Sequence, residues 1–97
     1  MAVLCSVSVR GGSQTDSVAL EQQVGERLEV LGGPPQGLIF LAVHPGDDGF
    51  TVSMAFRTHE LAEAEVDAVR EDAAAVGLQL GEASIVPIWS MALPGAM

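Results

Sequence analysis

The sequence of 97 residues is the size of one domain, and its 48% apolar content is enough for a core that needs no disulfides. A net charge of -9, with four arginines and no lysine, argues against nucleic acids and anionic membranes as partners, because both need clustered basic side chains. The sequence shows no signal peptide and no apolar run of membrane-spanning length, and its lone cysteine cannot form an internal disulfide, so we expect a cytoplasmic protein.

The first element is a strand at residues 2–10, where apolar side chains recur with a period of two until Gly11-Gly12 ends the pattern. The two faces of this strand differ in chemistry. One face is small and apolar, and the other carries hydroxyls and a charge: Val3, Cys5, Val7 and Val9 against Leu4, Ser6, Ser8 and Arg10.

A helix follows, with N-cap oxygens offered by Thr15, Asp16 and Ser17. Gly25 weakens this helix, and it could mark the close approach of another backbone. The "GGPPQG" segment at residues 32–37 ends the helix. Its apolar stripe recurs at helical spacing: Leu20, Val24, Leu28 and Leu31.

Two further strands are predicted at residues 38–44 and 50–57, joined as a hairpin by the turn-forming segment 45–49. The second of them places Phe50, Val52, Met54 and Phe56 on one face and Thr51, Ser53, Ala55 and Arg57 on the other. For the first strand the pattern leaves two alternatives for the face shared with Ser53: Ile39, Leu41 and Val43, or Phe40, Ala42 and His44.

Thr58 then caps a second helix, which ends at Gly77. A last strand is expected at residues 82–91, at an edge or a bulge because Pro87 lacks an N–H donor. Residues 92–97 read as a loose tail. The buried stripe of the second helix comprises Ala62, Val66, Val69, Ala73 and Val76.

The resulting order, β-α-β-β-α-β, predicts an α+β, ferredoxin-like sandwich formed by residues 1–97 as a single domain. In this fold four antiparallel strands lie in the order 4-1-3-2, and both helices cover one face of the sheet. The strand from residues 2–10 is central, so its hydroxyl-bearing side belongs to the middle of the open face.

This open face carries no lysine or glutamate, unlike a face that simply meets water. Small hydroxyls within an apolar wall suit a ligand cavity, so we expect a second subunit to cover the face and enclose a small apolar or aromatic molecule. The alternative is that the serines are small interface residues and no ligand binds. The predicted substrate-binding residues are Ser6, Ser8, Ser53 and Trp89.

The segment "GLIFLAVHPGDDGFTVSMAFRTHELAEAEV", Gly37 to Val66, resembles the central part of antibiotic-biosynthesis-monooxygenase-like proteins of the dimeric α/β-barrel superfamily. Phe56 stands where many members have Trp. Many members also carry a histidine inside the following helix, whereas His59 lies at its start. The resemblance implies a homodimer with two sheets facing across a cavity. It also implies a cofactor-independent monooxygenase, cyclase or isomerase acting on aromatic or polyketide-like compounds.

Three side chains are the predicted catalytic groups. Arg10 and Arg57 would stabilise an oxyanion, and His44, oriented by Asp47 or Asp48, would transfer a proton. No metal site and no cofactor is expected, since the sequence lacks a convincing ligand set or phosphate loop. The alternative function is a non-catalytic ligand-binding or assembly module that dimerises through the same face.

Overall fold

The structure is a computed structural model and describes residues 1–91; the predicted tail at 92–97 lies outside the described residues. Four strands and two helices follow one another in the predicted order, β-α-β-β-α-β. The elements are β1 (Val3–Arg10), α1 (Gln14–Leu31), β2 (Leu38–Gly46), β3 (Gly49–Phe56), α2 (His59–Ala75) and β4 (Ser84–Pro87).

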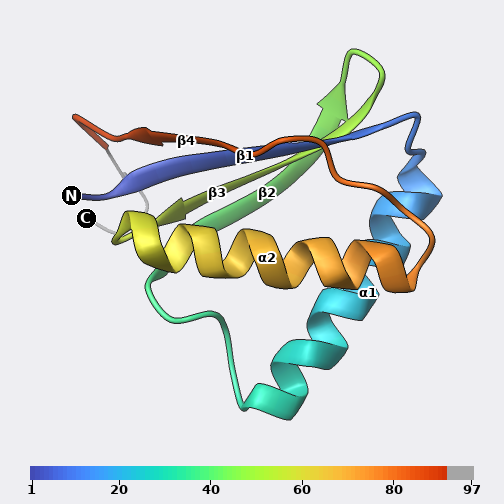
Figure 1. Ribbon diagram of the computed structural model, residues 1–97, viewed down its shortest axis with the longest axis horizontal. Coiled ribbons are helices and arrows are strands. Elements are labelled where there is room, and N and C mark those ends of the chain that lie inside the picture. The colour runs from blue at the N-terminus through green and yellow to red at the C-terminus, as the bar shows by residue number, and fades with distance from the viewer. Residues whose placement is uncertain (92–97) are drawn as a thin grey trace.

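The strands form one antiparallel sheet in the order β2-β3-β1-β4, as predicted. Both helices lie on the same side of the sheet, and the other face carries no helix (Figure 1). The ferredoxin-like α+β prediction is therefore confirmed. The central strands β1 and β3 pair in register from Val3 opposite Phe56 to Arg10 opposite Gly49.

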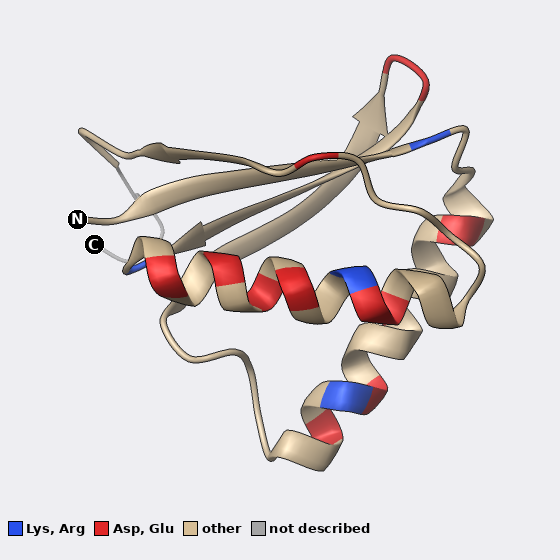
Figure 2. Ribbon diagram, in the orientation of Figure 1, with Lys and Arg blue, Asp and Glu red and all other residues tan. Residues whose placement is uncertain are grey.

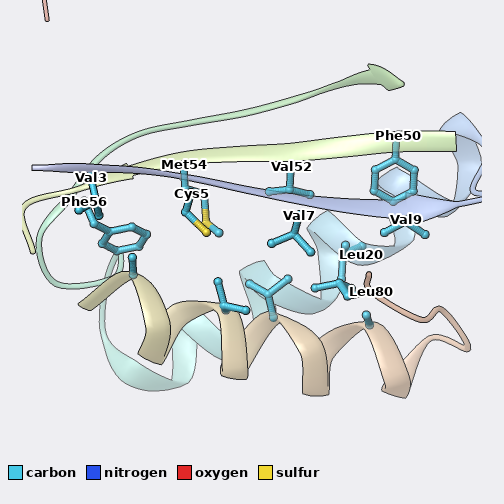
Figure 3. Packing of buried hydrophobic residues seen from close by; sticks show 14 residues of the cluster. Val3, Cys5, Val7, Val9, Leu20, Phe50, Val52, Met54, Phe56 and Leu80 are labelled. Atoms are coloured by element: carbon cyan, nitrogen blue, oxygen red, sulfur yellow. The ribbon is translucent and has the colours of Figure 1, made fainter. Parts of the chain in front are cut away.

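The core lies between the two central strands and α2 (Figure 3). The alternation in β1 buries Val3, Cys5, Val7 and Val9 on the helix side, as expected. Met54 and Phe56 of β3 are completely buried, and each such side chain contributes about 1.5–3 kcal/mol. The predicted stripe of α2 is also buried, apart from the half-buried Val76 at the end of the helix.

The β2–β3 hairpin is tighter than the sequence suggested. Pro45 and Gly46 pair with β3, so only Asp47 and Asp48 form the turn. Gly49 has φ +137°, and a Cβ there would collide with the Val9 carbonyl, so the close approach of β1 requires glycine.

The start of α1 also differs from the prediction, because the N-cap is Ser13 rather than one of residues 15–17. The Ser13 hydroxyl accepts from the Asp16 N–H (3.2 Å), and the Asp16 carboxylate accepts from the Ser13 N–H (2.9 Å). This reciprocal capping box satisfies two N–H donors at once and starts the helix before Thr15.

The C-terminal half of α1 stands away from the sheet (Figure 1). Leu20 is buried and Val24 and Leu28 are half-buried, but Leu31 is 70% exposed, so the predicted stripe is wrong at its last position. The expectation of a close backbone at Gly25 is also wrong, because a Cβ there would meet open space. Helical periodicity identifies a face of α1 but does not reveal how far the sheet extends beneath it.

An ion-pair cluster attaches α1 to α2 instead. The Arg27 guanidinium donates to both Glu65 carboxylate oxygens, at 3.2 and 2.8 Å, and its Nε donates to Asp72 at 2.8 Å. Both carboxylate side chains are only 6% exposed. These pairs raise the pKa of Arg27, although burial opposes the rise.

Charged residues elsewhere gather on the helices and the hairpin turn, while the strands are nearly free of them (Figure 2). Neither helix in residues 1–91 combines the length and apolar character needed to cross a membrane.

The last strand is shorter than the predicted 82–91, since β4 covers only Ser84–Pro87. It lies at the edge of the sheet, which confirms the position inferred from Pro87. Beyond the strand, the Ile88 N–H still donates to the Ala2 carbonyl at 2.9 Å.

Replacing Arg27 with alanine should lower the free energy of unfolding by about 2–4 kcal/mol, because two nearly buried carboxylates lose their shared cation. Arg10→Ala is the matched control, since its 3.7 Å pair with Asp48 is exposed to water and should contribute less than about 1 kcal/mol. Denaturant unfolding measures both variants. Equal losses would contradict this account of the cluster.

Candidate functional site

The open face of the sheet has a row of hydroxyls across its middle. Ser6 of β1 lies opposite Ser53 of β3 on one side and Ser84 of β4 on the other. One step along the strands, the Ser8 and Thr51 hydroxyls are 3.3 Å apart. Ser84 was not among the residues predicted for this face, because the sequence did not establish the register of the short edge strand.

The β2 register resolves the two alternatives for this face. Phe40, Ala42 and His44 pair with Ala55, Ser53 and Thr51, so they share the open side. The hydroxyl row is therefore flanked at one end by apolar side chains and at the other by a histidine. The apolar group comprises Leu4, Phe40, Ala55 and Val86.

The His44 ring bonds to Ser53, with 3.0 Å between His44 Nε2 and Ser53 Oγ. The other ring nitrogen, Nδ1, is 3.2 Å from the Pro45 carbonyl oxygen. The sequence suggested Asp47 or Asp48 as the group that orients this histidine. The structure instead places a main-chain carbonyl beside Nδ1 and pairs Asp48 with Arg10.

The two predicted catalytic arginines lie at opposite ends of the sheet. Arg10 ends β1 beside the hairpin, where it lines a shallow cavity of about 360 Å³ together with Ser8, Thr51 and Asp48. Arg57 directly follows Phe56 of β3, which pairs with the opposite end of β1. Within one chain, Arg57 is therefore separated from Arg10 and His44.

The other candidate residues lie outside this cluster. Trp89 is 89% exposed after the end of β4. His59 is exposed at the start of α2, and its Nε2 is 3.1 Å from a carboxylate oxygen of Glu63. Among residues 1–91, no three potential ligands come close enough together to hold a metal ion.

A second candidate site is an apolar groove between α1 and the sheet, which the sequence did not reveal. It encloses about 440 Å³, within the range of small-molecule sites. Gly25 lies on its α1 side, and Ser17 and Glu21 are its polar members. Its apolar walls come from α1, β2, β3 and α2: Leu20, Val24, Leu28, Leu41, Val43, Phe50, Val52 and Val69.

The groove exists because α1 diverges from the sheet, leaving Leu41 and Val43 of β2 only partly covered. The two signals in the sequence were Gly25 in the middle of a helix and an apolar stripe that continued to Leu31. Neither pattern distinguishes a groove from close helix packing.

No family model and no curated protein matches the sequence. Solved structures do match the fold at a probability of 1.00. The monooxygenase ActVA-Orf6 of Streptomyces coelicolor, in complex with nanaomycin D, has a TM-score of 0.60 at 16% identity, covering 96% of this chain and 91% of its own. The chain has the fold of the antibiotic-biosynthesis-monooxygenase-like proteins.

Two further structures share this antibiotic-biosynthesis-monooxygenase-like fold. A mutant of SnoaB, a cofactor-independent oxygenase from Streptomyces nogalater, has a TM-score of 0.56 at 10% identity and covers 96% of both chains. A Chloroflexus aurantiacus protein proposed to be an antibiotic biosynthesis monooxygenase has a TM-score of 0.60 at 16% identity, covering 95% of this chain and 98% of its own. The resemblance noted in residues 37–66 thus extends, as a fold, over nearly the whole chain.

Cys5 lies outside both candidate sites of this chain. It is completely buried in the core, and burial raises the pKa of its thiol. We expect the native chain to react with a thiol reagent only through opening of the core, at least about 1,000-fold more slowly than the unfolded chain.

The measurement is the rate of modification with and without denaturant. Folding raises the pKa of the Cys5 thiol, so the protonated thiol contributes to the stability of the folded state. This contribution is fully present below the ordinary thiol pKa, and it is lost as the pH rises through the raised pKa of the folded state. Rapid native labelling near neutral pH would show that Cys5 is accessible.

Proposed function

We propose that this protein is a small cofactor-independent enzyme, of monooxygenase or cyclase type, that binds an aromatic or polyketide-like molecule in the groove between α1 and the sheet. The observation that carries the proposal is the groove itself. Its walls are almost entirely apolar, and its volume of about 440 Å³ suits a compound of a few fused rings. Walls of this kind also keep water away from a reactive ring.

The arrangement of α1 supports this choice. Its attachment to α2 through Arg27 leaves the groove side of the helix to residues that carry no charge apart from Glu21. Gly25 costs the helix about 1 kcal/mol relative to alanine, and no neighbouring atom requires it for packing. Gly25 keeps the α1 wall of the groove open, and this is a functional reason for accepting its cost to helix stability.

The open face has a separate part in the proposal as the surface through which two copies associate. Its centre lacks charge and carries small hydroxyls beside apolar groups, so a second sheet could approach closely. The predicted serines and the candidates Arg10 and His44 lie on this face, on the other side of the sheet from the groove, so in this proposal they belong to the interface and do not act on the groove ligand. Arg57 and Trp89 lie at the opposite end of the sheet.

The second candidate function is the non-catalytic ligand-binding or assembly module. The separation of Arg57 from Arg10 and His44 favours it, because these three residues form no common site within one chain. Oxygen uptake together with product analysis distinguishes the two functions. A monooxygenase should consume oxygen with hydroxylated polycyclic aromatics in the absence of flavin, haem or metal, and a cyclase should convert them to a new product without oxygen uptake, whereas the module should only bind them.

Gly25→Phe should fill the groove and weaken binding of nanaomycin D, used as a probe, by at least about tenfold. Gly25→Ala is the matched control. It should retain binding and raise the free energy of unfolding by about 0.5–1 kcal/mol, because alanine suits a helix interior better than glycine.

Isothermal titration and thermal unfolding measure these effects. Unchanged affinity in a folded Gly25→Phe variant would place the ligand elsewhere. Failure of the native chain to bind any aromatic probe would remove the support for a groove ligand.

Ser6→Arg should convert the proposed dimer to a monomer, since it places a charge at the centre of the open face. Ala74→Arg adds the same charge to an exposed position of α2 and should leave the assembly unchanged. Sedimentation velocity reports the masses. A native chain that is monomeric at all concentrations would end the dimer proposal without affecting the groove.

A further inference from the structure

We propose that Ser53 and His44 form a nucleophile and base that transfer acyl groups from small esters on the open face. This activity is separate from the proposed chemistry in the groove and does not rest on it. Its basis is the 3.0 Å contact between Ser53 Oγ and His44 Nε2, where His44 stands on the edge strand β2.

The protonation of the ring follows from its two neighbours. The Pro45 carbonyl oxygen can only accept a hydrogen bond, so Nδ1 carries the proton and donates across 3.2 Å. In the neutral imidazole Nε2 is then the basic nitrogen, and it accepts from the Ser53 hydroxyl. An activated serine requires a histidine whose unprotonated nitrogen points at the serine hydroxyl, and Nε2 of His44 does so.

The sheet holds this geometry without a catalytic carboxylate. Ser53 and His44 stand on adjacent paired strands, and the partner of His44 in the ladder is Thr51, so the Ser53 contact is a diagonal one. The orienting carbonyl belongs to Pro45, whose position is fixed by its own pairing with Phe50. Because β2 is an edge strand, a small ester can approach His44 from the side of the sheet.

A hydroxyl donor for the developing oxyanion is also close. Ser6 lies directly opposite Ser53, where cross-strand Cβ atoms are separated by about 4.5–5.5 Å. Backbone N–H groups of the central strands are used in the ladders, so a side-chain hydroxyl is the natural donor here.

The proposed step conserves atoms and needs no redox partner. Ser53 Oγ attacks the ester carbonyl carbon and forms a new C–O bond, while its proton moves to His44 Nε2. The tetrahedral intermediate then expels the alcohol, which takes that proton from His44, and leaves an acyl-serine. Water hydrolyses the acyl-serine by the same two steps, yielding the carboxylic acid and free Ser53.

The test treats the full chain with an alkyl fluorophosphonate and locates the adduct by peptide mass spectrometry. We expect modification at Ser53, with a labelling rate at least about 100-fold lower in His44→Gln, because general-base assistance is worth that much or more. His59→Gln is the matched histidine control, since its ring contacts Glu63 and lies at the start of α2. Ser90→Ala is the matched serine control; both should label like the native chain.

A second measurement follows p-nitrophenyl acetate hydrolysis, which should be lost in both Ser53→Ala and His44→Gln. Full hydrolysis in Ser53→Ala would show that His44 acts alone and would overturn the proposal. Absence of a Ser53 adduct, or equal labelling of several exposed serines, would overturn it as well. Circular dichroism confirms that each variant is folded, which Ser53→Ala should be, since it removes one half-exposed hydroxyl.

Discussion

The register between β1 and β3 is the constraint on which the rest of the molecule depends. With Ser6 opposite Ser53 and Cys5 opposite Met54, every apolar residue of one strand meets an apolar residue of the other on the helix side. A shift by one residue would move serines into the core and valines onto the open face. The core and the chemical character of the open face are thus two results of one alignment.

The two helices cover this sheet unequally. α2 packs its small and branched residues along the central strands, whereas α1 touches the core chiefly through Leu20 and is attached to α2 by Arg27. The sheet consequently has one tightly covered half and one half with a groove. A charged link between helices can set such a separation because, unlike apolar packing, it does not require the whole helix face to be covered.

Features that depend on residues close in sequence, or on strict alternation, were predictable. The strand faces of Val3–Val9 and Phe50–Phe56, the order of elements and the edge position of Pro87 all follow from local patterns. The contact of His44 with Ser53 was not predictable, since it depends on the β2–β3 register and on a bulge between Leu38 and Phe40. The Arg27 cluster joins residues 38 and 45 positions apart, and burial of Glu65 and Asp72 runs against their usual preference for water.

The loose seating of α1 has a consequence for the motions of the protein. Regions with few buried apolar contacts open at lower free energy than the core, and they do so as cooperative units. α1 is such a unit, because it is connected to the rest chiefly by one cation and a few side chains at its N-terminal end. The protein would thus have a rigid sheet-and-α2 body beside a helix of lower local stability, and opening of that helix would expose the apolar walls of the groove.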